Sequence, residues 1–253
     1  MACARPELHM DVHVHDTKRT TSEHAAVRAA ELLETTVEDN GHASFVAATG
    51  ASQFDFLDVL TDAPDIDWDR TTMFHLDEYI GISETHPASF RKYMRERLIS
   101  EVHPGTVYLV DGDAPDPQAE CDRLNTAIED AGLDVAFIGI GENGHLAFND
   151  PPADFETTDP FIVVELDEAC RRQQLGEGWF DTIDDVPERA ISMSINQIMA
   201  ADAIVCTVPG ERKAQAVRDA LEGPVTPECP ASILQEHPQT DLYLDTGSAS
   251  LLE

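Results

Sequence analysis

Short apolar runs alternate with amphipathic segments of helical period along the chain, and this alternation limits the fold more than any other feature. Runs at residues 44–48, 72–76, 135–140 and 204–208 have the length and composition of buried strands. The segment 21–37, by contrast, repeats alanine and leucine at helical spacing. Strands that alternate with helices in this way form a mostly parallel sheet with helices on both faces, so the sequence predicts an α/β fold.

The remaining elements fit the same order. An edge strand is expected at residues 8–14, where apolar residues alternate with polar ones, and Asp116 followed by Pro117 is a typical helix start. The other expected strands are 107–110, 161–166, 190–193 and 242–244, and the other expected helices are 53–60, 87–99, 117–131 and 211–222. Because the 253 residues show no repeat or interdomain linker, a single domain spanning residues 1–253 is expected.

The chain is strongly acidic, with a formal net charge of −33 and only three lysines, Lys18, Lys92 and Lys213. Nucleic-acid backbones and anionic membrane surfaces attract Lys and Arg, so neither is expected as a partner. Acidic residues spread along a chain with so few lysines are typical of a salt-accumulating halophile, in which salt screens the self-repulsion. An ordinary acidic protein of a mesophile is the alternative.

The cysteines and the start of the chain favour a cytoplasmic protein. The five cysteines are odd in number, widely spaced and form no CxxC motif, as expected of reduced thiols. The N-terminal segment lacks the apolar core of a signal peptide, and no apolar run is long enough to span a bilayer. A soluble, cytoplasmic protein is therefore expected.

Residues 139–151, GIGENGHLAFNDP, are the first candidate for a reactive site. Glycines turn the chain at the end of an apolar run, and His145 lies in this turn with Asp150 five residues later. An imidazole tuned by a carboxylate both donates and accepts protons near neutral pH, so His145 and Asp150 are predicted to be catalytic. A histidine held structurally in a turn is the alternative.

Asp77 and Glu78 follow another apolar run, residues 72–76. The carboxyl ends of parallel strands form the ligand crevice of an open sheet. A carboxylate that is partly desolvated there has a raised pKa and is a better base. Solvated loop carboxylates are the alternative.

A phosphate site is predicted from two strand-to-helix turns. Thr49, Gly50, Ala51 and Ser52 open a helix after a strand, and backbone N–H groups and hydroxyls at such a point suit an anion. Lys213 lies in a second turn of this kind, in a chain that has almost no lysine. A surface lysine is the alternative for Lys213.

Two other groups of residues are less specific. His13 and His15 would share one face of a strand and form a metal pair, but no later spacing completes a ligand set, so no metal is expected. A polar cluster contains Arg171, Arg172, Gln173 and Gln174. It is either a surface loop beside buried aromatic residues or a source of contacts to substrate hydroxyl or phosphate groups.

Several motifs in the same order resemble the glucosamine-6-phosphate deaminase family, within a group that includes 6-phosphogluconolactonases. They are ATGAS at 48–52, LDEYIGI at 76–82, HPASFRKYM at 86–94, the 139–151 motif, the GERK turn at 210–213 and GPVTPECPASILQEHP at 223–238. The resemblance runs over most of the chain. It implies a Rossmann-like α/β fold and conversion of glucosamine 6-phosphate and water to fructose 6-phosphate and ammonia, a step of N-acetylglucosamine catabolism, without metal, nucleotide or other cofactor.

The resemblance also implies roles for individual residues. Asp77 corresponds to the base that moves the C2 proton, and His145, tuned by Asp150, to the acid/base that opens the pyranose ring. Lys213 and the turn at 49–52 correspond to the phosphate site, and Asn143 and Gly144 belong to the same catalytic loop. Family members range from monomers to hexamers, so the resemblance allows a homo-oligomer and leaves the choice of amino-sugar phosphate, gluco or galacto, open.

Three departures from the family pattern concern the site. Asn143 stands where some members have Asp, and Asp150 replaces the usual Glu, so its shorter carboxylate must lie closer to His145. The family arginine that contacts the substrate phosphate is missing at residues 178–180, which read GWF. Arg171 or Arg172 is expected to compensate for it.

The sequence leaves two other functions open. A 6-phosphogluconolactonase is the first, but such enzymes resemble DER where this chain has Asp77, Glu78 and Tyr79, and they lack a segment like residues 148–150. A non-catalytic sugar-phosphate sensor is the second, and the missing arginine is its main support.

The charge of the chain leads to a prediction about stability in salt. Raising KCl from about 0.1 M to about 1 M shortens the Debye length from ~10 Å to ~3 Å, which weakens repulsion among the acidic side chains. The melting temperature, followed by circular dichroism, should therefore rise with KCl into the molar range. A melting temperature that does not depend on salt would argue for the ordinary acidic protein.

Overall fold

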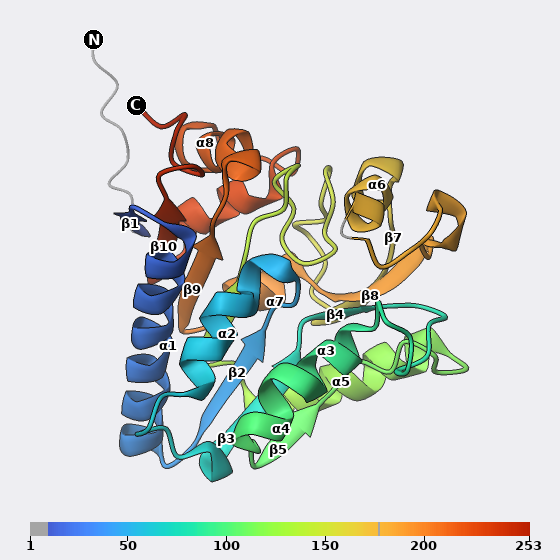
Figure 1. Ribbon diagram of the computed structural model, residues 1–253. Helices are drawn as coiled ribbons and strands as arrows, with labels where there is room; N and C mark the ends of the chain where they lie inside the picture. Colours follow the sequence, from blue (N-terminus) through green and yellow to red (C-terminus); the bar gives the residue numbers. More distant parts are fainter. Residues whose placement is uncertain (1–9, 177) are drawn as a thin grey trace.

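A seven-stranded parallel sheet forms the centre of the computed structural model, which describes residues 10–176 and 178–253 (Figure 1). The strand order is β1-β10-β9-β6-β2-β3-β5, and every neighbouring pair is parallel. The strands are β1 (Met10–His15), β2 (Ala43–Ala47), β3 (Thr71–His75), β5 (Thr106–Tyr108), β6 (Val135–Ile138), β9 (Ala203–Val208) and β10 (Thr240–Asp245). The predicted α/β class with a mostly parallel sheet is thus confirmed.

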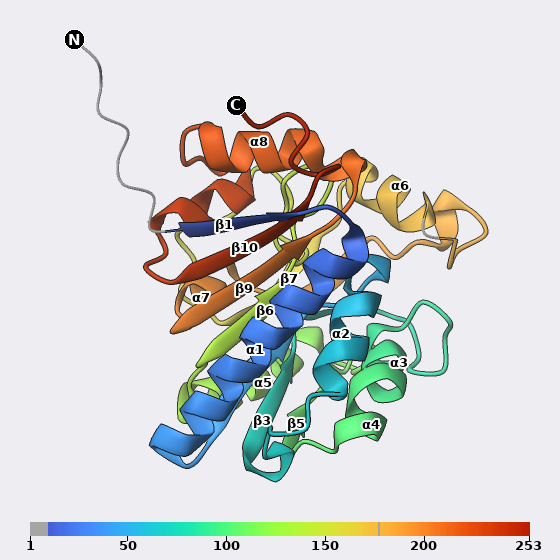
Figure 2. The ribbon, with the colours of Figure 1, turned by 60° about the vertical axis from the view of Figure 1, so that its left-hand side comes forward.

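Helices cover both faces of this sheet, because consecutive strand residues point to opposite sides. On β3, Met73 packs into the core under α1 and α2, whereas Phe74 packs into the core under α5 and α8. The first face carries α1 (Lys18–Asn40), α2 (Phe54–Thr61), α3 (Phe90–Met94) and α4 (Ser100–Val102). The second face carries α5 (Pro117–Ala131), α7 (Ile195–Met199) and α8 (Ala214–Glu222). Figure 2 shows α1, α2 and α3 in front of the sheet.

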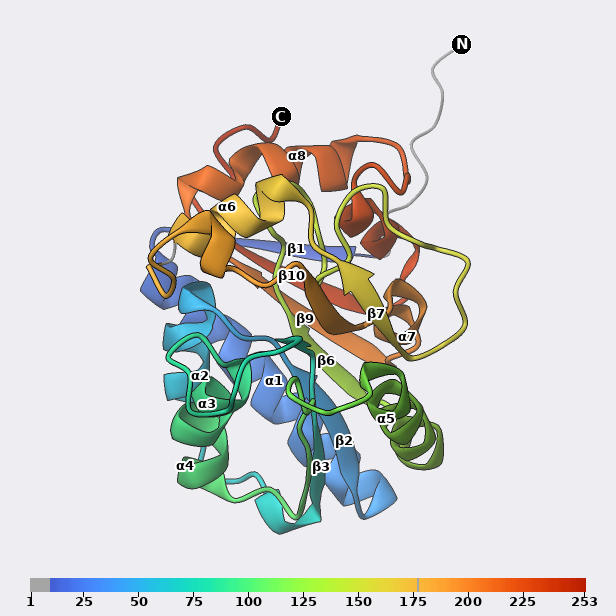
Figure 3. The same cartoon turned by 90° about the vertical axis from the view of Figure 1, so that its right-hand side faces the viewer.

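A second sheet of three antiparallel strands lies beside the first, in the order β4-β8-β7 (Figure 3). Its strands are β4 (Asp77–Tyr79), β8 (Arg189–Met193) and β7 (Phe161–Glu165), and α6 (Glu168–Gly176) packs next to it. The runs at 161–166 and 190–193 therefore do not join the parallel sheet. Their apolar content predicted strands correctly but could not give their partners or direction.

Polar side chains set the start of the helices. Asp116 accepts hydrogen bonds from the backbone N–H groups of Gln118 and Ala119, which confirms the predicted start of α5. The helix predicted at 87–99 begins later, at Phe90, because Ser89 caps it. It then runs on through a π-helical segment, Arg95–Ile99, into α4.

The edge strand β1 differs from the prediction in its exposure. Val12 and Val14 are 40% and 51% exposed, and Leu8 and His9 of the predicted strand lie outside the described residues. His13 stacks on Tyr243, and His15 stacks on His24. The two imidazole rings therefore pack against other rings of the surface. None of the helices within residues 10–176 and 178–253 is long and apolar enough to cross a membrane.

A buried ion pair joins the two sheets to α3. Glu78, which is fully buried, accepts hydrogen bonds from the Ser89 hydroxyl and from the N–H groups of Phe90 and Arg91 at the start of the helix. The Arg91 guanidinium lies 3.4 Å from Glu78. It also donates to Asp111 at 2.6 Å and to Asp113 at 2.7 Å.

Replacement of this arginine should be strongly destabilising. Arg91→Ala leaves the Glu78 carboxylate buried without its cation, so the free energy of unfolding should fall by about 3–5 kcal/mol. Urea unfolding in high salt measures the loss. Arg95→Ala removes an exposed arginine paired with Glu84 and should change stability by less than about 1 kcal/mol. Equal losses in the two variants would contradict the importance given to the buried pair.

Candidate functional site

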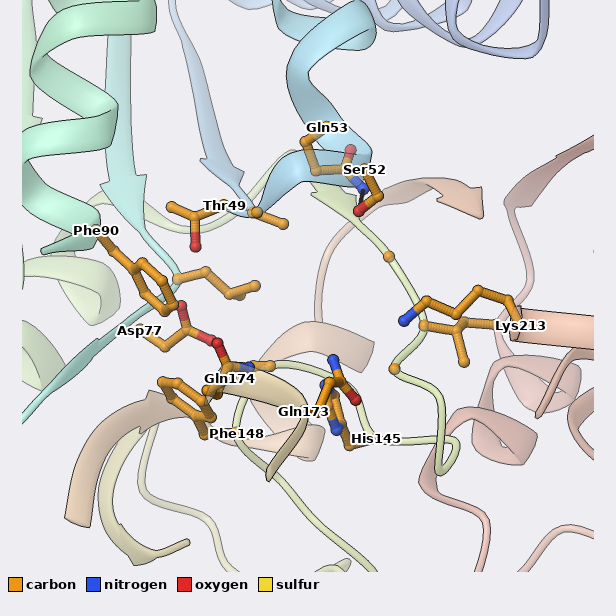
Figure 4. A pocket seen from close by; sticks show the side chains of 17 residues that line it. Thr49, Ser52, Gln53, Asp77, Phe90, His145, Phe148, Gln173, Gln174 and Lys213 are labelled. Atoms are coloured by element: carbon orange, nitrogen blue, oxygen red, sulfur yellow. Dashed lines mark hydrogen bonds between the residues drawn. The ribbon is translucent and has the colours of Figure 1, made fainter. Parts of the chain in front are cut away.

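A pocket opens where four parallel strands end at their carboxyl edge, as expected for a ligand site in an open α/β sheet (Figure 4). Segments that follow β2, β3, β6 and β9 form most of its wall, and α3 and α6 complete it. The pocket is lined by Ala48, Thr49, Gly50, Ser52, Gln53, Leu76, Asp77, Phe90, Gly139, Ile140, Gly141, His145, Ala147, Phe148, Gln173, Gln174 and Lys213.

Asp77 is a buried carboxyl group in the wall of this pocket. It is 5% exposed, and its Oδ1 has no hydrogen-bond partner among the described residues. Burial, together with the neighbouring Glu78 charge, raises the pKa of Asp77 to about 8. The two adjacent acidic residues therefore differ in role. Glu78 is engaged by Arg91 and the start of α3, whereas Asp77 is able to exchange a proton near neutral pH.

His145 and Asp150 form the predicted pair on the other side of the pocket. His145 Nδ1 lies 3.2 Å from Asp150 Oδ1, so the shorter Asp side chain does reach the imidazole. Asn143 links the two: its Nδ2 donates to Asp150 at 3.1 Å, and its Oδ1 accepts from the backbone N–H of His145 at 3.1 Å. Burial opposes ionisation of Asp150, but contacts with His145, Asn143 and Cys170 outweigh it and lower the pKa of this carboxyl.

Two glycines of the 139–151 motif are required by this geometry. A Cβ atom at Gly141 would lie 2.3 Å from the His145 ring, so only glycine lets the imidazole pack there. Gly144 has a φ of +86°, a left-handed conformation that glycine adopts without strain. Asn143, Gly144 and Asp150 lie behind His145 and do not line the pocket themselves.

The predicted phosphate residues gather at the other end of the pocket. Thr49, Gly50 and Ser52 line it after β2, and Lys213 reaches it from the turn after β9. Ala51 faces a neighbouring groove instead, and its carbonyl oxygen accepts a hydrogen bond from Lys18 at 3.1 Å. Among the described residues that line the pocket, Lys213 is the one with a permanent positive charge.

The structure places Arg171 and Arg172 outside the pocket, contrary to the prediction. Arg171 donates to the carbonyl oxygens of Ile183 and Val186, and Arg172 pairs with Glu168 along the helix. Both arginines lie on helix α6, whereas a surface loop was one of the two interpretations of this cluster from the sequence.

The helical period of α6 explains this orientation. Residues three and four positions after Cys170, namely Gln173 and Gln174, share its face and point into the pocket, while the arginines point elsewhere. The Gln174 side chain accepts a hydrogen bond from the Tyr79 hydroxyl at 2.7 Å.

Several pocket residues were not predicted as site residues from the sequence, among them Phe90, Phe148 and Gln53. Phe90 and Phe148 stack at a centroid distance of 5.8 Å and give the pocket an apolar wall near Asp77. Gln53 donates to the carbonyl oxygen of Thr207 at 3.1 Å and so ties the phosphate turn to β9. Phe148 belongs to the 139–151 motif, but nothing in that motif shows which apolar residue faces the ligand.

Comparison with known proteins gives the family of the chain. The family model for glucosamine-6-phosphate isomerases/6-phosphogluconolactonase matches residues 16–243. The chain therefore belongs to the glucosamine-6-phosphate deaminase family, within the superfamily that also contains 6-phosphogluconolactonases.

Individual relatives support the deaminase branch. The chain is 41% identical to glucosamine-6-phosphate deaminase of Exiguobacterium sibiricum over 74% of this chain and 73% of that protein. It is 38% identical to the same enzyme of Lactobacillus delbrueckii subsp. bulgaricus over 89% and 94%. A monomeric glucosamine-6-phosphate deaminase superposes with a TM-score of 0.87 at 31% identity, covering 96% of this chain and 100% of that one. A 6-phosphogluconolactonase from Shewanella baltica, at 20% identity and a TM-score of 0.75 over 93% and 97%, shares the fold.

The burial of Asp77 leads to a prediction with a definite sign. The pKa of Asp77 is about 8 in the folded protein and near 3.8 in the unfolded chain. Between these values the folded protein holds a proton that the unfolded chain has lost, so stability falls as pH rises, by at most about 1.4 kcal/mol per pH unit. Asp77→Asn has no such group. Its stability relative to the native protein should increase from about pH 4 to about pH 8 and then level off.

Urea unfolding at constant high salt, from about pH 5 to pH 9, measures this difference. Asp130→Asn, at the exposed end of α5, is the control for loss of one negative charge. If the two variants followed the same pH dependence, the Asp77 carboxyl would not carry the raised pKa.

Proposed function

We propose that the protein is an aldose–ketose isomerising deaminase that converts glucosamine 6-phosphate and water to fructose 6-phosphate and ammonia. One observation carries the proposal. A buried carboxyl, Asp77, with an unpartnered oxygen faces the same pocket as His145, and the turn at Thr49 and Ser52 with Lys213 lies at the far end. The relatives that share at least 31% identity with this chain, described above, are deaminases of this substrate.

The two proton-transfer groups suit the first half of this reaction. His145, held by Asp150 and Asn143, gives a proton to the ring oxygen and accepts one from the C1 hydroxyl, which opens the pyranose to the aldehyde. Asp77, as the carboxylate, then takes the proton from C2. The amino group of the bound substrate, when protonated, favours this ionised form of Asp77.

The second half returns that proton and releases nitrogen. As C2 loses its proton, the oxygen on C1 gains one and the amino group gives one up, which leaves a double bond between C1 and C2. Asp77 then delivers the C2 proton to C1, so the double bond moves to C2 and nitrogen and a ketimine with a C1 hydroxyl forms. Water adds to C2, and ammonia leaves as the C2–N bond breaks, which gives the ketose. Each step moves protons between side chains, substrate and water, so the proposed mechanism uses no metal or nucleotide.

The phosphate end of the pocket has a positioning role in this proposal. The hydroxyls and N–H groups after β2 and the Lys213 ammonium hold the 6-phosphate, which places C2 near Asp77 and the ring oxygen near His145. Arg171 and Arg172 lie outside the pocket. The positive charge that binds the 6-phosphate therefore comes from Lys213 and is not shared with a second cation. The step in N-acetylglucosamine catabolism, the cytoplasmic location, the halophilic character and the oligomeric state remain predictions.

The test is ammonia release from purified protein in molar KCl. Glucosamine 6-phosphate, galactosamine 6-phosphate and 6-phosphogluconolactone are offered in parallel, and lactone opening is followed separately. We expect ammonia and fructose 6-phosphate in equal amounts from the first sugar, and none with Asp77→Asn. Ammonia from galactosamine 6-phosphate alone would change the substrate. Lactone opening without ammonia would show a lactonase, and no reaction at all would favour the sensor.

Removal of the Lys213 ammonium should mainly weaken substrate binding. A charge-assisted hydrogen bond is worth about 1.5–3 kcal/mol, so Lys213→Ala should raise KM for the sugar phosphate about 10- to 100-fold with a smaller change in kcat. Lys92→Ala is the matched control, because Lys92 lines only the neighbouring grooves. An unchanged KM in Lys213→Ala would remove this lysine from the phosphate site.

A further inference from the structure

We propose that His145, Asp150 and Cys170 form a binding site for a divalent zinc ion, and that zinc bound there inhibits the enzyme. The three side chains meet behind the pocket, where α6 packs against the 139–151 motif. Their ligand atoms, one from each residue, all lie within 4.8 Å of one another. The inhibition, but not the binding, rests on the proposed function.

The donor set has the chemistry that zinc prefers. Cysteine sulfur, histidine nitrogen and aspartate oxygen are all common zinc ligands, and a tetrahedral ion with three protein ligands keeps one position for water. Bonds of about 2.0–2.2 Å to nitrogen and oxygen set these two atoms about 3.3 Å apart. His145 Nδ1 and Asp150 Oδ1 are already 3.2 Å apart, and the Cys170 sulfur lies within 4.8 Å of the other ligand atoms.

Two of the ligand groups have buried atoms that lack a partner. His145 Nδ1 and Asp150 Oδ2 are buried and have no hydrogen-bond partner among the described residues, since the 3.2 Å contact of Nδ1 with Oδ1 is not aligned as a hydrogen bond. His145 is 8% exposed, and Cys170 is 1% exposed. Buried polar atoms are normally paired, and a cation bound by both residues would satisfy these two atoms.

The surrounding charges favour a cation at this point. The carboxylates of Asp150 and Asp167 lie near Cys170, and Asp167 accepts a hydrogen bond from the backbone N–H of Cys170. A metal that binds the sulfur displaces the thiol proton. The two carboxylates stabilise the dication at this point.

Occupancy of this site blocks the role given to His145. In the proposed reaction Nδ1 faces Asp150 while the opposite nitrogen exchanges protons with substrate. A metal on Nδ1 takes the place of a proton on that nitrogen and keeps the imidazole from its cationic form, so ring opening stops. Chelation of the metal restores the pair.

The experiment combines metal binding with activity. Protein freed of metal by a chelator is titrated with Zn²⁺ against a chromophoric chelator, and with Co²⁺, whose thiolate complexes have a characteristic charge-transfer band. Ammonia release from glucosamine 6-phosphate is measured at each zinc concentration and divided by the rate of the same protein without metal. Cys170→Ser removes the sulfur at nearly constant size. Cys229→Ser, a partly exposed cysteine beside Gly144, is the matched control.

We expect one zinc per chain, loss of activity that follows occupancy, and recovery with excess chelator. Cys170→Ser should bind zinc at least 10-fold more weakly and lose the thiolate band of cobalt, while Cys229→Ser should bind like the native protein. Failure of native protein to bind zinc, or equal binding by Cys170→Ser with an unchanged melting temperature, overturns the site. Zinc that binds through Cys170 without loss of activity overturns the inhibition. Absence of ammonia release before zinc is added would count against the proposed function, and the binding titrations would still decide the site.

Discussion

A buried ion pair between Glu78 and Arg91 fixes the part of the molecule on which the site is built. Glu78 accepts the first N–H groups of α3, and Arg91, from the same helix, neutralises it. The loop after β5 is held at the same place, because Arg91 binds Asp111 and Asp113. This loop also packs closely against β4, since a Cβ at Gly112 would lie 2.2 Å from the Tyr79 carbonyl oxygen. With β4 held on both sides, Asp77 has no freedom to turn toward solvent, and its carboxyl stays desolvated.

Desolvation has opposite consequences for stability and for chemistry at Asp77. A structural carboxylate in this position would be paired, as Glu78 is by Arg91 and the start of α3. The absence of a partner for Asp77 among the described residues keeps its proton exchangeable, at the expense of folding free energy above neutral pH. A substrate with an ammonium group brings into the pocket the positive charge that stabilises the ionised form of Asp77.

Much of this could be predicted from the sequence, and the misses have physical reasons. Inner parallel strands such as β2, β6 and β9 were recognisable because they are buried on both faces and read as continuous apolar runs. Asp116 with Pro117 marked a helix start. Asp77 and His145 were found because they follow such runs. The partners of β7 and β8 were not predictable, since apolar content is the same in a parallel and an antiparallel sheet. The prediction that Arg171 or Arg172 contacts the substrate was wrong. The rotation of α6 about its axis decides which of its side chains face the pocket, and these are Gln173 and Gln174.

The three lysines of the chain all lie around the end of the pocket where the phosphate site is proposed. Lys213 lines it, Lys18 donates to the carbonyl oxygen of Ala51 in the turn after β2, and Lys92 lines the adjoining groove. An anionic sugar phosphate that diffuses toward a protein of net charge −33 meets repulsion at long range and attraction only within the last few ångströms. Added salt screens the long-range repulsion between protein and substrate before it screens the short-range attraction. The rate of encounter with substrate should therefore increase as ionic strength rises. Ordinary electrostatic steering has the opposite dependence on salt. The placement of the three lysines thus makes the expected rate of substrate capture depend on ionic strength.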